Sequence, residues 1–366
     1  MNKKIRVGIL FGGRSAEHEV SLQSAKNVVD ALDKTKYEPV LIGIDKKGHW
    51  HISDSSKYLL HAENPKLIKL NESRKEVGLI PGRKENQFMV ADQREAMSDI
   101  DVVFPILHGP LGEDGTIQGM LRLANLPFVG SSVLGSAVCM DKDVTKRLLS
   151  QAGLPICKYL AFKKSDAKKI KYSEVTKTLG SPIFVKPANM GSSVGVSKVK
   201  SESEFHAALT SAFTYDQKIL IEEGIVGREL EVSILGNDNP ITSIVGEIIP
   251  QAEFYSYEAK YIDENGAVLD IPAKIDGSTS DEVKSLAVKA FKALECAGLA
   301  RCDFFFRKDG KLLINEINTI PGFTRISMYP KLWEASGISY SELIDRLLQL
   351  AIERHADESE LKTDVD

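Results

Sequence analysis

The sequence predicts an α/β protein in which a parallel-sheet domain precedes two units with α+β character. The apolar run Ile5–Phe11, a helical pattern ending near Leu32 and the run Glu38–Ile44 form a strand–helix–strand order, which is typical of a parallel sheet. The 366 residues exceed what one hydrophobic core usually serves, so two or three domains are expected. Farther along, strands and helices follow in mixed order, and two late strands meet at the turn Asp309-Gly310.

Charge and composition limit the classes of partner. The 47 lysines and arginines nearly balance the 51 acidic residues, and the net charge of −4 favours neither nucleic acid nor an anionic membrane surface. No apolar run approaches the length of a membrane span, and the basic start leads into a short strand, not a signal peptide. We therefore expect a cytoplasmic protein with small-molecule partners. Its four cysteines lack paired spacing and should be buried free thiols: Cys139, Cys157, Cys296 and Cys302.

Two glycine-rich turns indicate a ligand site in the first domain. Gly12-Gly13 follows the first strand, and Ser15 is the expected N-cap of the next helix. His108 follows a buried strand, Asp101–Leu107, and opens a turn that reads GPLGEDG. Ligands of open α/β sheets bind beyond the carboxyl ends of strands, and the GxGxxG spacing of a dinucleotide site is absent. His108 is thus either a substrate contact or a hydrogen-bonded structural residue.

A smaller unit after the helix Asp141–Ala152 carries a phosphate-binding signal. Its loop Pro187–Gly195 reads PANMGSSVG and joins two strands, so it is either a flap over phosphate oxygens or an ordinary surface hairpin. Lys186, just before the loop, could pair with phosphate charge. The strand entering Glu222-Glu223 could meet a purine and Glu229 a ribose, although acidic strand ends are commonly solvated. The other expected elements are strands near Lys158–Phe162, Ile183–Lys186, Val194–Val199 and Lys218–Glu222, and helices near Tyr172–Leu179 and Ser201–Phe213.

Four further segments complete the pattern. Loop 250–263 is rich in aromatic residues, which either pack onto a core or close over a site as a lid. Thr279 or Ser280 is the expected N-cap of a helix, and Ser339–Arg354 is the last amphipathic helix. The acidic tail after His355 is expected to be disordered, and the polar stretch 53–94 to be an irregular surface elaboration.

Three oxygen-bearing side chains stand out in the last pair of strands. Glu316 and Asn318 are two residues apart on one strand and therefore share a face, and antiparallel pairing across the turn could add Asp303. Such groups between apolar strands are costly without a cation, and hard oxygen ligands suit Mg²⁺. The alternative is an ordinary hairpin with solvated acids.

Six motifs taken together, in this order along the chain, resemble the D-alanine–D-alanine ligases of the ATP-grasp superfamily: GGRSAEHEVS, HGPLGEDGTIQG, VKPANMGSSVGVSKV, EFYSYEAKY, RCDFFF and NEINTIPGFTRIS. The resemblance implies a parallel-sheet substrate domain, 1–138, followed by two ATP-grasp domains, 139–223 and 224–366, with 250–263 as a lid. It also implies a homodimer, and ATP-driven ligation of two D-alanine molecules for peptidoglycan precursor synthesis.

The resemblance implies a role for each site residue. Asp303, Glu316 and Asn318 would bind two Mg²⁺ ions, or Mn²⁺ in their place. The resemblance also allows for a bound monovalent cation. The first D-alanine would meet Glu17 and His108. The nucleotide would meet Lys142, Lys186, Ser192, Ser193, Glu222, Glu223, Ile225, Glu229, Tyr255 and Lys260. The second D-alanine would lie near Gly322, Ser327 and Met328, and the catalytic set would be Glu17, Ser192, Tyr261 and Arg301.

The implied chemistry suits these residue types. ATP would phosphorylate the first D-alanine to an acyl phosphate, which the amine of the second then attacks, with Arg301 and the Gly322 N–H stabilising the oxyanion. Three alternatives remain. One is a ligase for D-lactate or D-serine, and in the resembling family a tyrosine at Tyr261 accompanies dipeptide formation. The others are another ATP-dependent carboxylate–amine ligase, which Glu17 and His108 disfavour, and a nucleotide-binding regulator without catalysis, which the arginine and acid set disfavours.

Overall fold

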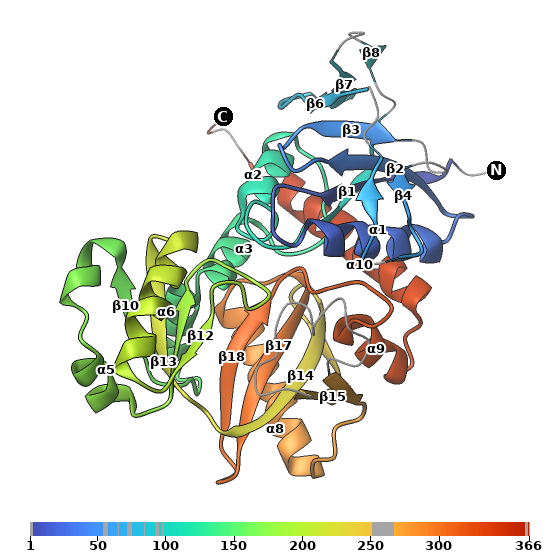
Figure 1. Cartoon of the computed structure of the whole chain (residues 1–366). Helices are drawn as coiled ribbons and strands as arrows, with labels where there is room; N and C mark the ends of the chain where they lie inside the picture. Colours follow the sequence, from blue (N-terminus) through green and yellow to red (C-terminus); the bar gives the residue numbers. More distant parts are fainter. Residues whose placement is uncertain are drawn as a thin grey trace.

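Three sheets organise the chain in the computed structural model (Figure 1). The structure describes residues 3–53, 58–64, 66–71, 75–83, 85–91, 95–96, 99–250, 267–362 and 365. These three larger sheets belong to the N-terminal part, the middle and the C-terminal part of the chain, and two small sheets accompany the first. No helix in these ranges is both long and apolar enough to cross a membrane. The four cysteines are buried free thiols, as predicted.

The first sheet has the order β3-β2-β1-β9. Strands β1 (Ile5–Gly12), β2 (Tyr37–Ile44) and β9 (Val102–Ile106) are parallel, which confirms the prediction, while the edge strand β3 (Trp50–Ser53) runs antiparallel to β2. The crossover helix α1 (His18–Ala31) joins β1 to β2. The carboxyl ends of the parallel strands therefore meet at one edge, where their loops can share a ligand.

The stretch 53–94 was expected to be irregular, and its described residues correct this. They form short antiparallel pairs, and Ile68 and Phe88 are buried. Polar composition concealed this packing because each strand contributes only one to three apolar side chains. The strands are β4 (Leu59–Leu60), β5 (Lys69–Leu70), β6 (Val77–Leu79), β7 (Phe88–Val90) and β8 (Glu95–Ala96).

The middle sheet has the order β10-β13-β11-β12 and is antiparallel throughout. Helices α2 (Thr116–Leu123), α3 (Val133–Met140) and α4 (Lys142–Gln151) lead into it from β9. Apolar side chains of α5 and α6 cover one face of the sheet. The remaining elements of this unit are β10 (Tyr159–Lys163), η1 (Lys164–Lys169), α5 (Tyr172–Leu179), β11 (Ile183–Pro187), β12 (Ser197–Val199), α6 (Glu202–Tyr215) and β13 (Lys218–Glu223).

The third sheet has the order β16-β15-β14-β17-β18, again antiparallel. Its hairpin of β17 and β18 is the pair of strands expected around the Asp309-Gly310 turn. Helix α8 packs on it through a buried stripe that contains Val283, Ala287 and Ala290. The elements are β14 (Gly227–Gly236), β15 (Ile241–Pro250), β16 (Ala267–Asp270), α8 (Gly277–Ala293), β17 (Gly298–Arg307), β18 (Leu312–Asn318) and α9 (Met328–Ala335).

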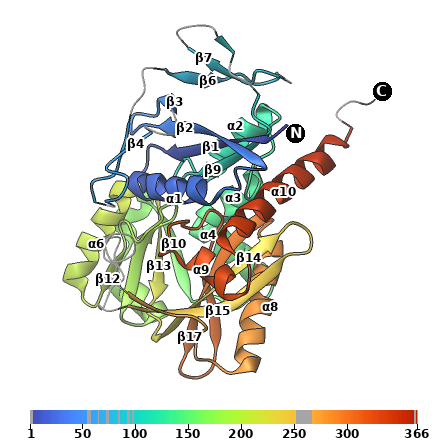
Figure 2. The same cartoon turned by 90° about the vertical axis from the view of Figure 1, so that its right-hand side faces the viewer.

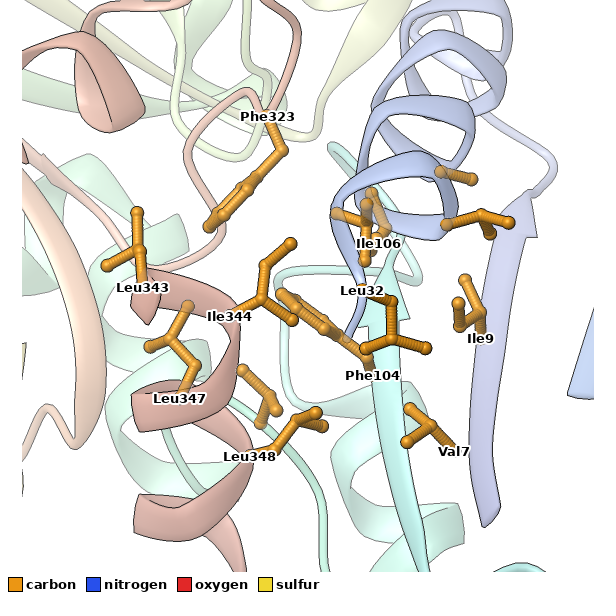
Figure 3. Close-up of a cluster of buried hydrophobic side chains, with 14 of the residues drawn as sticks. Val7, Ile9, Leu32, Phe104, Ile106, Phe323, Leu343, Ile344, Leu347 and Leu348 are labelled. Carbon is orange, nitrogen blue, oxygen red and sulfur yellow. The ribbon is translucent and has the colours of Figure 1, made fainter. Parts of the chain in front are cut away.

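The last helix, α10 (Tyr340–Ser359), packs against the first sheet although it is far from it in sequence (Figure 2). Figure 3 shows its Leu343, Ile344, Leu347 and Leu348 facing apolar side chains of β1, β9 and α1, with Phe323 at one end of the cluster. One continuous core therefore holds the N-terminal sheet against the C-terminal part of the chain.

Several element boundaries differ from the sequence predictions. Helix α1 begins at His18, and Ser15 instead accepts a hydrogen bond from the Glu17 N–H (3.1 Å). Asp276, not Thr279 or Ser280, caps α8, because its carboxylate accepts from the Thr279 N–H (2.9 Å). Strand β12 starts only at Ser197, after a loop in which Ser192, Ser193 and Gly195 have positive φ. The first residues of the acidic tail, expected to be disordered after His355, are helical, because α10 continues to Ser359.

Candidate active site

The hairpin of β17 and β18 brings the three predicted oxygen-bearing side chains together. Asp303 lies opposite Glu316 and Arg301 opposite Asn318 in the antiparallel register. Arg301 donates two hydrogen bonds to Asp303, from Nε to Oδ1 and from Nη2 to Oδ2 (both 2.7 Å), and Asn318 Nδ2 donates to Asp303 Oδ2 (3.1 Å). Asp303 is buried. Its charge is therefore balanced by Arg301. The turn predicted the hairpin, and a one-residue shift in register between Asp303 and Phe304 places Asp303 opposite Glu316.

A further acid on the neighbouring strand β14 was missed. Glu231 lies opposite Asp303 in the β14–β17 register and is buried, and its Oε2 is 2.9 Å from Arg301 Nε. The signal was present in the sequence, because Glu231 is two residues beyond Glu229 and shares its face in an otherwise apolar strand. Arg301 thus lies between two carboxylates, which fixes the direction of its guanidinium group.

The turns of the first domain meet the flap of the middle sheet. The Ser192 hydroxyl donates a hydrogen bond to the Glu17 carboxylate, across 175 positions of sequence. Ser192 and Ser193 both have positive φ, 50° and 61°, a conformation that L residues rarely adopt. The flap residues Gly191 and Ser192 therefore form part of the same cleft as Glu17.

His108 bridges two parts of the chain. Its Nδ1 lies 3.0 Å from the Ile320 carbonyl oxygen and its Nε2 lies 3.2 Å from Ser24 Oγ. Burial lowers the pKa of His108 to about 4, so the ring is neutral at neutral pH. The neutral ring then donates from Nδ1 to Ile320 and accepts at Nε2 from Ser24. Both nitrogens have protein partners, and the ring also lines the cleft.

Glu113 is a second residue that the sequence analysis did not single out. Its carboxylate accepts from the Gly109 N–H (2.7 Å) and from the Ile320 N–H (3.2 Å), and so ties the GPLGEDG turn to the loop after β18. Burial first, and the Glu17 carboxylate second, raise the pKa of Glu113 to about 8. The GEDG letters were in view, but nothing local distinguished this acid from a solvated one.

Lys142, Lys186 and the buried Glu222 line the other end of the site, and Lys146 contacts Glu222 from behind the lining. Glu222 lies 2.6 Å from Lys186 Nζ and 3.2 Å from Lys146 Nζ. Burial alone would raise the pKa of Glu222, but the two ammonium groups outweigh it and lower the pKa to about 2. Lys146, also missed, is buried and lies 3.2 Å from Cys157 Sγ. Lys142 donates to the Met190 carbonyl (2.6 Å), and burial lowers its pKa.

Two adjoining clefts contain every described residue of the predicted site. The first, about 1010 Å³, is lined by Glu17, His108, Ser192, Arg301, Asp303, Glu316, Asn318, Gly322, Ser327 and Met328. The second, about 1240 Å³, is lined by Lys142, Lys186, Ser192, Ser193, Glu222, Glu223, Ile225, Glu229 and Glu316. Ser192, Glu229 and Glu316 line both clefts. The predicted lid residues Tyr255, Lys260 and Tyr261 lie outside the described residues.

The donor set at the junction of the clefts fits a hard divalent cation. Asp303, Glu316 and Asn318 offer carboxylate and amide oxygens, without thiol or imidazole, and this is the set that Mg²⁺ prefers alongside substrate phosphates. Lys142 Nζ lies 3.9 Å from Glu316 Oε2, so a phosphate held by that lysine would also lie near these oxygens. The pairing of strands thus assembles cation ligands beside a lysine-rich cleft.

Two family models and full-length relatives match the chain. Residues 6–131 match the family model of the D-ala D-ala ligase N-terminus, and residues 148–349 that of its C-terminus. The chain is 57% identical to a D-alanine–D-alanine ligase of Oceanobacillus iheyensis, over 98% of both chains, and 55% identical to D-alanine–D-alanine ligase A of Escherichia coli strain K12, over 99% of both.

Solved structures show the same likeness. The D-alanine-D-alanine ligase of Coxiella burnetii superposes with a TM-score of 0.84 at 38% identity, covering 98% of this chain and 96% of that one. The VanG D-Ala:D-Ser ligase of Enterococcus faecalis gives 0.83 at 36% identity, covering 95% of this chain and 100% of that one. With both family models matched in order and full-length relatives above 50% identity, the chain belongs to the ATP-grasp family of D-alanine–D-alanine ligases.

Proposed function

We propose that the two adjoining clefts are the ATP site and the D-alanine site of one ligation centre. The chain is a D-alanine–D-alanine ligase, which uses ATP to join two D-alanine molecules for peptidoglycan precursors. The observation that carries the assignment of the clefts is their junction. Glu316 and Ser192 line both, so a phosphate in the lysine-rich cleft lies next to a carboxylate substrate in the other.

The nucleotide occupies the cleft between the middle and the third sheets. Lys142 and Lys186 neutralise phosphate oxygens, and Ser192 and Ser193 of the flap cover them. The Glu222 carboxylate, held by two lysines, orients Lys186 toward the phosphates. Adenine lies against the segment from Glu222 through Glu223 to Ile225, and Glu229 accepts from the ribose hydroxyls. Tyr255 and Lys260 belong to the same proposal by resemblance alone.

The two D-alanine molecules occupy the other cleft. Glu17 accepts from the ammonium group of the first, with His108 near its carboxylate. The carboxylate of the second lies at the start of α9, where Ser327 and Met328 line the cleft and the helix N-terminus favours an anion. Ser327 Oγ already lies 2.7 Å from Thr324 Oγ1, so its hydroxyl is held in place.

The reaction proceeds in two steps. The carboxylate of the first D-alanine attacks the γ-phosphorus of ATP, and ADP leaves with the electron pair of the broken P–O bond. The deprotonated amine of the second D-alanine then attacks the acyl carbonyl, and phosphate leaves. Arg301 and the Gly322 N–H stabilise the oxyanion between these events. Asp303, Glu316 and Asn318 would hold Mg²⁺ or Mn²⁺, which would neutralise phosphate charge.

Exclusion of water protects the acyl phosphate, which hydrolysis would otherwise waste. The hydrogen bond from Ser192 to Glu17 supports a closed position of the flap over the first substrate. Tyr261 completes this set in the proposal, and the loop 250–263 is the lid. The proposal also includes three domains, with limits at residues 138 and 223. It further includes a homodimer, a bound monovalent cation and a cytoplasmic location.

The test is release of ADP over a panel of D-alanine, D-serine and D-lactate, with each product identified by mass. We expect D-alanyl-D-alanine as the main product. If no ADP forms with D-alanine, ATP and Mg²⁺, the ligase assignment is contradicted. If the main product ends in D-serine or D-lactate, the second substrate is not D-alanine.

A pair of variants on one hairpin tests the cation site. Asp303→Asn removes a proposed ligand, and we expect turnover to be lost while the protein stays folded, with a lower thermal unfolding midpoint because Arg301 loses a charged partner. Asp309→Asn changes an exposed acid at the turn of the same hairpin and should retain turnover. Near-normal turnover of Asp303→Asn at saturating Mg²⁺ would refute the assignment.

A further inference from the structure

A cluster of two histidines and one aspartate lies outside the ligation site, where β2 turns into the edge strand β3. Asp45 follows β2 directly, His49 precedes β3 and His51 lies within it. One donor atom from each residue lies within 4.8 Å of the other two. In the part of the chain that the structure describes, no other group of three His, Cys, Asp or Glu side chains meets this criterion.

The carboxylate of Asp45 is held in one orientation by the turn itself. Its Oδ1 accepts hydrogen bonds from the backbone N–H groups of Lys47 (2.8 Å) and His49 (2.9 Å). Its Oδ2 is thereby directed to the two imidazoles, 3.0 Å from His49 Nδ1 and 3.4 Å from His51 Nε2. Asp45 and His51 are 5% exposed, so the cluster is built into the fold.

These separations match the edges of a tetrahedral metal site. Zinc binds imidazole nitrogen and carboxylate oxygen at roughly 2.0–2.2 Å, and a tetrahedral angle then separates neighbouring donors by roughly 3.3–3.6 Å. The observed 3.4 Å lies within this range, and the observed 3.0 Å is a few tenths of an ångström below it. An ordered backbone that already orients one ligand lowers the cost of assembling the others.

We propose that Asp45, His49 and His51 bind one transition-metal ion of the Zn²⁺ class. Imidazole nitrogen favours zinc, cobalt, nickel and copper over Mg²⁺, so this site and the oxygen-lined site at Asp303 select different ions. The side chain of His49 is 52% exposed, which leaves room for a water molecule as fourth ligand. The ion displaces the ring protons that otherwise point at Asp45 Oδ2.

The local charges allow a cation at this turn. Lys46 follows Asp45 in the chain, and its Nζ lies 2.6 Å from Glu19 Oε1, so its charge is compensated. Burial would raise the pKa of Asp45, but hydrogen bonds from His49 and Lys47 outweigh it and lower the pKa well below its usual range. The carboxylate is therefore ionised, as a ligand must be.

The site would brace the strand end beside the substrate loop. The Ile44 carbonyl, one residue before Asp45, accepts from the Gly13 N–H (2.8 Å), and the Gly13 carbonyl oxygen lies 2.8 Å from His18 Nδ1. Hydrogen bonds through Gly13 thus connect the turn of Asp45 to His18, the neighbour of Glu17 in sequence. A metal clip there stabilises the first domain without touching substrate.

The competing explanation is a metal-free cluster in which both rings donate N–H to one carboxylate oxygen. Titration with Co²⁺ and Zn²⁺ distinguishes this cluster from a metal site. The full chain is dialysed against chelator, kept free of nucleotide, and titrated with Co²⁺ while the visible absorption of tetrahedral cobalt is recorded. We expect one equivalent with imidazole ligation, displaced by Zn²⁺, and a higher thermal unfolding midpoint with Zn²⁺ bound.

Variants assign that equivalent. His49→Gln changes a half-exposed side chain and should abolish the cobalt spectrum, and so should Asp45→Asn, whose amide oxygen can still accept the turn's N–H groups. His206→Gln, at an exposed histidine elsewhere, and Glu316→Gln, in the ligation site, should keep it. No tetrahedral cobalt signal in the parent protein, or its persistence in folded His49→Gln, would overturn the proposal.

Discussion

Replacement of Glu113 by glutamine should change the pH dependence of stability in a specific direction. The pKa of Glu113 is raised by burial and by Glu17 from an ordinary 4.5 to about 8. Its folded-state pKa therefore lies above the unfolded value, so its contribution to stability is complete below about pH 4.5 and is lost as pH rises toward 8. Glutamine cannot ionise and does not show this loss.

The size of the effect follows from proton linkage. One proton bound by the native but not by the unfolded chain changes the free energy of unfolding by about 1.4 kcal/mol per pH unit. Between pH 5 and 7 the parent should lose up to about 2–3 kcal/mol relative to Glu113→Gln. This is an upper value, because Glu113 keeps some solvent contact at the cleft wall and titrates together with Glu17.

The free energy of unfolding of Glu113→Gln should also be lower than that of the parent by an amount that is the same at every pH. Glutamine has one acceptor oxygen, so either the Gly109 or the Ile320 N–H loses its partner, at a cost of about 1–3 kcal/mol that does not depend on pH. Urea unfolding followed by tryptophan fluorescence at half-unit steps from pH 5 to 8 separates slope from offset. Glu334→Gln, at an exposed helical position, is the matched control and should run parallel to the parent. A pH-independent difference between the parent and Glu113→Gln would refute the reasoning.

Three further predictions concern the contacts around the site. Lys146→Met leaves the buried Glu222 with one cation instead of two and should lower the free energy of unfolding by about 3–5 kcal/mol in urea; a loss below 1 kcal/mol would contradict the ion-pair argument. Leu347→Ala opens a cavity in the core between α10 and the first sheet and should cost about 2–5 kcal/mol, measured as a shift of the urea midpoint at constant slope. Glu231→Gln weakens a charge-assisted contact of about 1.5–3 kcal/mol to Arg301, so kcat/KM should fall about ten- to hundredfold with little change in melting; unchanged kinetics would assign Glu231 no positioning role.

Local patterns in the sequence predicted the hairpin of β17 and β18 and the oxygen-bearing side chains on it. Glu316 and Asn318 share a face because strand side chains alternate. The Asp309-Gly310 turn sets the register of Phe304–Phe306, and a one-residue shift between Asp303 and Phe304 then places Asp303 opposite Glu316. The order of six motifs identified the family. The strand–helix–strand start predicted the parallel sheet. These inferences hold because backbone sterics and turn chemistry act over a few residues.

Contacts between distant segments were decided only by the tertiary structure. Glu17 meets Ser192, Glu113 meets Ile320, and Lys146 shares the Glu222 carboxylate with Lys186. No local pattern distinguishes these acids and lysines from solvated ones, because their burial depends on which surfaces pack together.

The same reason explains the errors in the element boundaries. The charges of the C-terminal tail suggested disorder after His355, yet α10 continues to Ser359, with Arg354 hydrogen-bonded to the Phe128 carbonyl (3.0 Å) in the first domain's part of the chain. The sequence by itself therefore determined the family, the sheet classes and the acid set of the hairpin. The tertiary structure alone decided which distant side chains complete the site, since long-range burial is a property of whole packed surfaces and not of any segment.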